Sequence, residues 1–216
     1  MIVLINPNST ESMTHGMLKT ANKFNHTQTT LEAWTNYGGP PSIQGYEDGE
    51  ASVPPMLELI EQANKRGASG IIIGCADDTG LRRARKIANC PVVGIGQSAY
   101  HLAALAGDQF SVVTTLSVSV PILEENIRSY GLANKLAKVR ASGVKVLELE
   151  TDPINAQARV LKEIQKAEKN DKVSSVVLGC AGMTNIPTIA PDNLKVILID
   201  GVAAGVQVAC ALLPKG

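Results

Sequence analysis

The chain has 216 residues, and its 20 basic and 20 acidic side chains leave a formal net charge of zero. A neutral chain lacks the broad positive surface that binds nucleic acid, and 3 % aromatic residues are too few for a base-stacking platform. No apolar run approaches the ~20 residues that span a bilayer, and the apolar start of the chain lacks the cationic region of a secretion signal. We therefore expect a cytoplasmic protein with reduced cysteines that binds neither nucleic acid nor membrane.

Short apolar segments alternate with amphipathic ones along the chain, and Gly and Pro mark the turns between them. The apolar segments predict strands over residues 2–5, 29–34, 70–74, 92–95, 110–114, 144–149, 175–178 and 195–199. Helical spacing predicts helices over residues 11–24, 53–63, 81–88, 98–106, 120–130, 155–169 and 202–213, and residues 35–50 are expected to form a long loop. This alternation is typical of an α/β fold whose parallel sheets are flanked by helices.

The two halves of the chain repeat each other. Ile72–Ala76 reads Ile-Ile-Gly-Cys-Ala, and Val177–Ala181 reads Val-Leu-Gly-Cys-Ala about 105 residues further along. Neighbouring strands keep nearly the same offset, so duplication explains the pattern better than the general likeness of strand–helix units. We predict two pseudo-symmetric α/β lobes, residues 1–106 and 107–216, with the active site in the cleft between them. The last helix (202–213) is expected to pack back onto the first lobe.

Cys75 and Cys180 occupy equivalent places in this repeat, each just beyond the C-terminal end of a strand, where open α/β sheets bind ligands. Two thiols facing across a cleft suit the inversion of a carbon that carries an acidic C–H. A thiolate removes the proton from one face, and a thiol returns a proton to the other. Backbone N–H groups of the following turns would stabilise the thiolate. Cys90 and Cys210 have no counterpart in the repeat and are expected to be structural.

Polar turns at the same predicted sheet edge supply further candidate ligands. The segment Asn6–Thr10 offers amide and hydroxyl groups before a helix, and Thr114–Thr115 occupies the matching place in the second half. Ser9 or Thr10 is equally suited to capping that helix. No metal site is expected, because the chain has no Cys-x-x-Cys and its three His lack the spacing of metal ligands.

Two carboxyl groups follow the first cysteine of the pair. Asp77 and Asp78 would raise the pKa of the Cys75 thiol if they were ionised and close to it. One of the two is expected to cap the helix that begins at Leu81, because Asp is a favoured residue at helix N-termini.

Six motifs together resemble the hydantoin and allantoin racemases of the aspartate/glutamate racemase superfamily, and the resemblance covers nearly the whole chain. They are Ile5-Asn6-Pro7-Asn8-Ser9-Thr10, Gly39-Pro40-Pro41-Ser42-Ile43-Gln44-Gly45-Tyr46, Cys75-Ala76-Asp77-Asp78-Thr79-Gly80-Leu81, Phe110-Ser111-Val112-Val113-Thr114-Thr115-Leu116, Leu178-Gly179-Cys180-Ala181-Gly182-Met183 and Asp200-Gly201-Val202-Ala203-Ala204.

The resemblance implies a cofactor-independent racemase of five-membered cyclic ureides, either 5-substituted hydantoins or allantoin. It implies a homo-oligomer, a tetramer or a hexamer. Cys75 and Cys180 match the two catalytic cysteines of the family. The substrate contacts carried over by position are Asn6, Ser9, Thr10, Ile43, Ala76, Asp77, Thr114, Thr115, Ala181, Gly182 and Met183.

Several alternatives within the same superfamily remain open. Amino-acid racemases commonly follow each cysteine with Asn-Thr, and the residues here, Ala76-Asp77 and Ala181-Gly182, weigh against free aspartate or glutamate as the substrate. A decarboxylase needs only one cysteine, whereas a cis–trans isomerase is compatible with two. A binding protein without turnover is the last alternative, and it is favoured only by Gln97, which stands where the family often has Glu.

Overall fold

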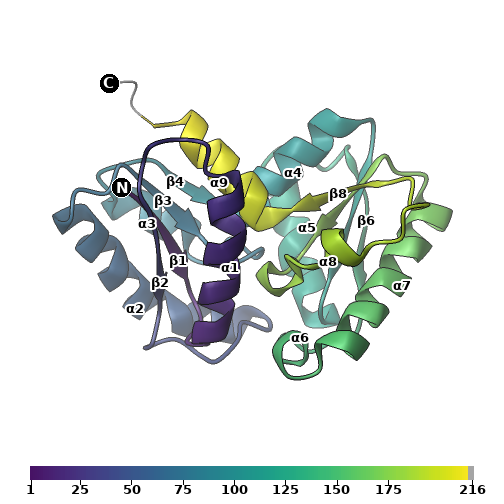
Figure 1. Cartoon of the computed structure of the whole chain (residues 1–216), viewed down its shortest axis with the longest axis horizontal. Coiled ribbons are helices and arrows are strands. Elements are labelled where there is room, and N and C mark those ends of the chain that lie inside the picture. Colours follow the sequence, from purple (N-terminus) through teal and green to yellow (C-terminus); the bar gives the residue numbers. More distant parts are fainter. Residues whose placement is uncertain (214–216) are drawn as a thin grey trace.

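The computed structural model describes residues 1–213 and contains two four-stranded sheets in which every pair of neighbouring strands is parallel. The strand orders β2-β1-β3-β4 and β6-β5-β7-β8 are the same when the two halves are aligned. The strands are β1 (Ile2–Asn6), β2 (Leu31–Thr35), β3 (Gly70–Ile73), β4 (Val92–Gly94), β5 (Phe110–Thr114), β6 (Leu136–Ala141), β7 (Ser175–Leu178) and β8 (Ile197–Asp200). The predicted α/β architecture with duplicated lobes is confirmed (Figure 1).

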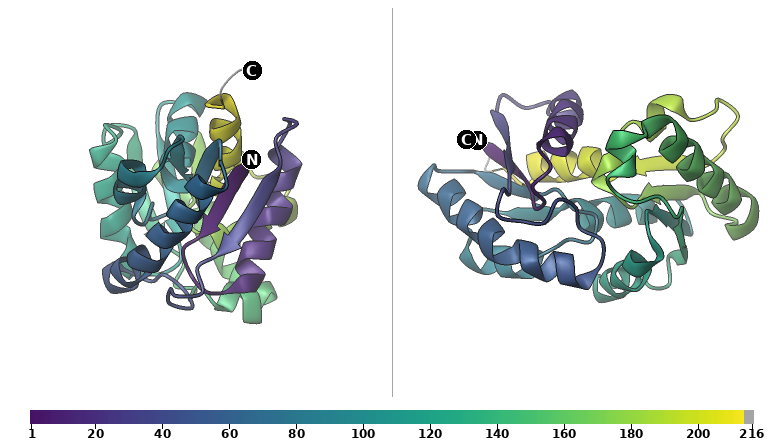
Figure 2. Two further views of the ribbon diagram at one scale, coloured as in Figure 1. Left: turned by 90° about the vertical axis from the view of Figure 1, so that its left-hand side faces the viewer. Right: turned by 90° about the horizontal axis from the view of Figure 1, so that it is seen from below.

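Helices flank both sheets, and the two lobes lie side by side (Figure 2). The α-helices are α1 (Glu11–Phe24), α2 (Tyr46–Lys65), α3 (Leu81–Ile87), α4 (Ile95–Ala106), α5 (Val120–Ser129), α6 (Glu148–Thr151), α7 (Pro153–Asp171), α8 (Ile186–Ile189) and α9 (Gly201–Ala211). Two short 3₁₀ turns are η1 (Ser117–Ser119) and η2 (Ala181–Met183). None of the helices in residues 1–213 combines the length and the apolar character needed to cross a bilayer.

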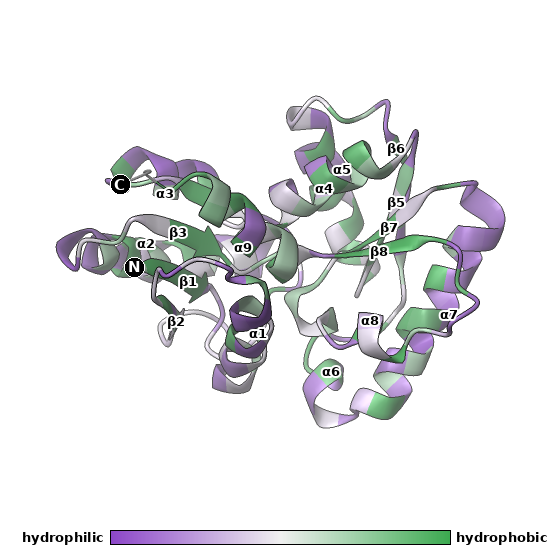
Figure 3. Ribbon diagram, turned by 45° about the horizontal axis from the view of Figure 1, so that its top comes forward, coloured by the Kyte–Doolittle hydropathy of each residue, from purple (hydrophilic) through white to green (hydrophobic). Residues whose placement is uncertain are grey.

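The central strands are buried on both faces, which explains why their sequences are continuously apolar (Figure 3). In β1, Ile2 and Leu4 pack against helices α1 and α9, while Val3 and Ile5 pack against α2 and α3 on the opposite face. This alternation is the period of two that a strand imposes on its side chains. A parallel sheet covered on both faces therefore forms the core of each lobe.

Two helices are exchanged between the halves of the sequence. Helix α9, from the second half, packs Val202 and Val206 onto the first sheet, while α4, from the first half, packs Tyr100 onto the second sheet. The two helices also contact each other: a Cβ added at Gly205 would lie 3.0 Å from the Ile95 side chain. A division of the chain near residue 107 stays a prediction, and the last three residues of the predicted second lobe lie outside the described residues.

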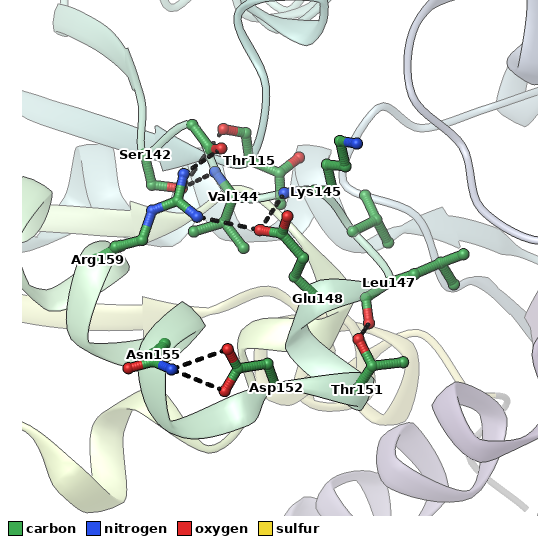
Figure 4. Close-up of polar contacts among 12 residues, drawn as sticks. Thr115, Ser142, Val144, Lys145, Leu147, Glu148, Thr151, Asp152, Asn155 and Arg159 are labelled. Carbon is green, nitrogen blue, oxygen red and sulfur yellow. Dashed lines mark hydrogen bonds and ion pairs between the residues drawn. The ribbon is translucent and has the colours of Figure 1, made fainter.

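The strand predicted over residues 144–149 is wrong. The strand at this edge is Leu136–Ala141, whose partly exposed, polar sequence lacks the apolar signal of a buried strand. Residues 142–147 instead form an irregular segment that leads into α6, with Val144 and Leu149 buried. Glu148 holds this segment by accepting hydrogen bonds from the Lys145 N–H at 3.1 Å and from Arg159 at 3.1 Å (Figure 4).

The predicted loop over residues 35–50 ends earlier than expected, because α2 begins at Tyr46 rather than near residue 53. The helix runs through Pro54 and Pro55, which obscured its beginning in the sequence. The predicted side-chain cap of α1 is also wrong. The Thr10 hydroxyl donates to the Pro41 carbonyl at 2.6 Å, and Asn8 Oδ1 accepts the Thr10 N–H at 2.9 Å.

Exposed Gly16 in the interior of α1 offers a direct test of helix propensity. A Cβ added there would meet no heavy atom within 4 Å, so Gly16→Ala is expected to raise the free energy of unfolding by about 1 kcal/mol. Gly67→Ala is the matched control. A Cβ at Gly67 would also meet no heavy atom within 4 Å, but the backbone there is left-handed, with φ +70°. That change is expected to destabilise the fold. Urea unfolding checks both, and a loss of stability in Gly16→Ala would contradict the packing of α1.

Candidate active site

Cys75 and Cys180, the two cysteines related by the internal repeat, line one cavity to which both halves of the chain contribute. Cys75 follows Gly74 at the end of β3, and Cys180 follows Gly179 at the end of β7. A side chain at either glycine would force a neighbour to shift: a Cβ at Gly74 would lie 2.8 Å from Met17 Sδ, and one at Gly179 would lie 2.9 Å from the Val112 side chain. The cavity lining consists of Asn8, Met13, Met17, Ile43, Gly74, Cys75, Ala76, Asp77, Thr114, Thr115, Ser119, Val146, Gly179, Cys180, Ala181 and Gly182.

The two thiols have equivalent local surroundings. A backbone N–H two residues further along the chain faces each sulfur: that of Asp77 faces Cys75, and that of Gly182 faces Cys180. Each N–H lowers the pKa of the thiol that it faces. Cys75 differs in one respect, because Thr79 Oγ1 donates a further hydrogen bond to its Sγ at 3.5 Å. The duplicated turns therefore hold two thiols of similar character.

Burial dominates the electrostatics of this pair. It raises the pKa of Cys75 well above the usual value, and the nearby Asp77 carboxylate raises it further. Burial raises the pKa of Cys180 to about 12, with the Gly182 N–H opposing the shift and Asp77 adding to it. No Lys, Arg or His is among the described residues that line the cavity. Both thiols are consequently protonated in the unliganded cavity at neutral pH, and one must lose its proton before it can act as a base.

Asp78 fixes the loop that carries the first cysteine. Its carboxylate accepts hydrogen bonds from the N–H groups of Gly96 at 3.0 Å and Gln97 at 2.7 Å, and from the Tyr130 hydroxyl at 2.8 Å. It therefore caps α4, and the prediction that one Asp side chain caps the helix at Leu81 is wrong. Gly80, which is left-handed with φ +68°, precedes that helix without a side-chain cap. Burial raises the pKa of Asp78 to about 7, although these three hydrogen bonds oppose the shift.

Asp77 has a different environment from its neighbour. Its backbone carbonyl accepts a hydrogen bond from Asn126 Nδ2 at 2.7 Å, but its buried side-chain atom Oδ2 has no partner among the described residues. Burial raises the pKa of the Asp77 carboxyl to about 7, and the negative charge of Asp78 adds to the shift. The site thus contains a third titratable group beside the two thiols.

Most of the predicted substrate contacts line the cavity, but some do not. Ile43, Ala76, Asp77, Thr114, Thr115, Ala181 and Gly182 lie in its wall. Asn6 lies behind the wall, where its side-chain amide donates to Asn8 Oδ1 at 2.9 Å and to Thr14 Oγ1 at 3.0 Å. Met183 packs in the apolar core of the second lobe, and Ser9 and Thr10 are absent from the lining. The roles of all these residues as substrate contacts stay predictions.

Several residues of the cavity wall were not predicted from the sequence. Asn8 lies in the polar turn that was singled out, but the hydrogen bonds that select it over its neighbours depend on the folded turn. Val146 was assigned to a strand, and its place in the wall follows from the irregular segment before α6. Ser119 ends the 3₁₀ turn after β5 and is marked by no pattern in the sequence.

The other two cysteines lie outside the cavity. Cys90 packs against the apolar cluster between α2 and the first sheet, and Cys210 packs against the cluster beneath α9. All four cysteines are free thiols. Gln97 also points elsewhere, because its side-chain oxygen accepts a hydrogen bond from Arg85 at 2.7 Å. Gln97, the residue that favoured a binding protein without turnover, is therefore not part of the cavity wall.

Comparison with known proteins gives the same picture as the geometry. The profile of the Asp/Glu/hydantoin racemase family matches residues 2–209. A hydantoin racemase of Rhizobium meliloti is 44 % identical over 215 residues, which cover 100 % of this chain and 89 % of the relative. Allantoin racemase from Klebsiella pneumoniae has a similar structure, with a TM-score of 0.94 and 33 % identity, covering 98 % of this chain and 86 % of that one. Allantoin racemase from Pseudomonas fluorescens is also similar, with a TM-score of 0.92 and 31 % identity. The match covers 98 % of this chain and 89 % of that one.

The fold and the similarities define an isomerase of the racemase type. The chain belongs to the Asp/Glu/hydantoin racemase family.

Proposed function

We propose that this racemase inverts a five-membered cyclic ureide, a 5-substituted hydantoin or allantoin, and that Cys75 and Cys180 are its two bases. The observation that carries the proposal is the placement of two thiols, from equivalent strand ends, in the wall of one cavity. Relatives that cover most of this chain are named hydantoin racemase and allantoin racemase, which supports the same substrate class.

The reaction is a transfer of protons that leaves their number unchanged. The thiolate of one cysteine takes the proton from the ring carbon beside the carbonyl, and the electron pair of the C–H bond moves into the enolate. The thiol of the other cysteine donates its proton to the opposite face of that carbon, so that thiolate and thiol have exchanged places. No cofactor is required for this step, because the ring carbonyl holds the electron pair.

The cavity wall fits an uncharged ring better than an amino acid with two carboxylates. The wall offers backbone groups, small residues and hydroxyl groups. Asp77 is its one carboxyl side chain among the described residues, and the wall has no basic side chain among them. Thr114 supports the second cysteine indirectly, because its hydroxyl donates to the Gly179 carbonyl at 3.0 Å. The predicted homo-oligomer, a tetramer or a hexamer, stays a proposal.

A direct test offers the protein single enantiomers of a 5-alkylhydantoin and of allantoin in deuterated water. We expect optical rotation to decay while the ring C–H exchanges for deuterium, without added metal or cofactor. L-aspartate and L-glutamate serve as comparison substrates, and reactions without protein give the spontaneous rate. Retention of rotation by both ureides, or faster racemisation of the amino acids, would contradict the proposal.

A further inference from the structure

One buried side-chain oxygen in the described part of the chain has no hydrogen-bond partner, and it belongs to Asp77. Leaving a buried polar group unpaired is unfavourable, and more so for a charged group. Native proteins satisfy almost all such groups, so an exception in a cavity wall points to a partner that arrives with a ligand. The Oδ2 atom of Asp77 is such an exception.

Asp77 lies in the wall of two adjoining cavities. One is the cavity of the two cysteines. The other, of about 210 Å³, lies between the N-terminal part of α2 and α5 and includes Tyr46, Glu50 and Asn126 in its lining. The backbone of Asp77 is held from two sides, by its N–H facing Cys75 and by its carbonyl accepting from Asn126. The Asp77 backbone is therefore anchored at the boundary between the two cavities, and the residue contributes to both walls.

The titratable groups that line the two cavities with this carboxyl are all acidic, and the nearest cations lie outside both walls: Arg83 pairs with Glu50 at 2.7 Å, and Arg85 lowers the pKa of Asp78. Cys75 and Cys180 face it within the first cavity, Asp78 follows it in the loop, Glu50 shares the second cavity, and Tyr100 packs from α4. Neither cavity has a Lys, Arg or His among the described residues of its wall. A negative charge on Asp77 therefore has no cationic partner among the described residues of either wall.

We propose that Asp77 determines the charge selectivity of the site. Its Oδ2 accepts a hydrogen bond from a ring N–H of an uncharged ureide, and its carboxylate repels ligands whose substituent carries a carboxylate. This inference rests on the proposed substrate class, because the ring N–H is the donor that completes the unpaired atom.

The selectivity has a defined dependence on pH. Because burial raises the pKa of Asp77 to about 7, the carboxylate is present at pH 8.5 and mostly protonated at pH 6. Rejection of a carboxylate-bearing ligand is accordingly strong at pH 8.5 and weaker at pH 6. The ligand's own carboxylate, with an ordinary pKa near 4, stays ionised across this range.

The test measures binding by calorimetry for two ligands, 5-isopropylhydantoin and hydantoin-5-propionic acid. At pH 8.5 we expect the wild-type protein to bind the neutral ligand at least ~10-fold more tightly, since juxtaposed like charges repel each other. In Asp77→Asn, which has the same shape and still accepts a hydrogen bond, the ratio is expected to fall to about 3 or less. Asp77→Leu loses affinity for the neutral ligand as well. Asp192→Asn, an exposed acid outside both cavities, is the matched control and keeps the wild-type ratio.

Three results would overturn the inference: an unchanged ratio in Asp77→Asn, a ratio that does not fall between pH 8.5 and pH 6, or no binding of either ligand to the wild type. Thermal unfolding of each variant separates selectivity from misfolding. A further outcome is that the two ligands bind with the expected ratio of affinities while the neutral one is not racemised. That result would contradict the proposed reaction and leave the role of Asp77 intact. The two proposals can therefore fail separately.

Discussion

Replacing either Cys75 or Cys180 with alanine is expected to lower the rate of racemisation of a single ureide enantiomer by roughly 10²–10⁴-fold or more, the contribution of a positioned acid or base. Each variant loses one of the two groups that must act on opposite faces, so inversion in both directions suffers. The measurement is the polarimetric rate from each pure enantiomer. Serine is a poor replacement, because a hydroxyl is a far weaker acid than a thiol.

The controls for this prediction are the two cysteines outside the cavity. Cys90→Ala and Cys210→Ala remove partly buried sulfur atoms without touching the cavity wall, so both variants are expected to keep the wild-type rate of racemisation. A normal rate in Cys75→Ala or in Cys180→Ala would refute the assignment of that residue as a base.

Replacing Gly96 with alanine is expected to destabilise the protein by about 3 kcal/mol, near the upper end of the usual cost of overpacking. Asp78 draws the first turn of α4 so close to the loop after Cys75 that a Cβ at Gly96 would lie only 2.2 Å from the Ala76 carbonyl oxygen. That oxygen belongs to backbone, and Asp78 Oδ2 lies 2.8 Å from the same point. The helix or the loop has to shift, and Ala76 lines the cavity.

Urea unfolding and racemisation rates check the Gly96→Ala prediction together. We expect the free energy of unfolding to fall and the rate to fall with it, because the displaced loop carries the first thiol. Gly16→Ala makes the same chemical change in a helix with free space, and it is expected to act in the opposite direction on stability. Equal stability of the two variants would show that the contact between α4 and the Cys75 loop is looser than the geometry requires.

The sequence predicted most reliably what depends on local burial. The central strands β1, β3, β5 and β7 carry continuous apolar runs because both of their faces are covered, and all four were found. The edge strand β6 was missed, because its partly exposed residues remove that signal. The helical start at Tyr46 was hidden by the two prolines further along α2.

The site shows the same division between local and tertiary information. The pair of cysteines could be predicted, because the internal repeat records their equivalence in the sequence alone. The partners of Asp78 could not, since they lie in the first turn of α4 and directly after α5 and meet it only in the folded chain. The unpaired oxygen of Asp77 is likewise a property of tertiary packing that no spacing of residues reveals.

The central claim is that Cys75 and Cys180 serve opposite faces of one carbon, and hydrogen exchange in the single variants tests it most directly. In deuterated water, each alanine variant retains one cysteine, whose thiolate form can remove a proton from one enantiomer and return deuterium to the same face without inversion. We predict that Cys75→Ala exchanges one enantiomer and Cys180→Ala exchanges the other, with optical rotation retained in both cases. Exchange of the same enantiomer by both variants, or of both enantiomers by either one, would contradict the account.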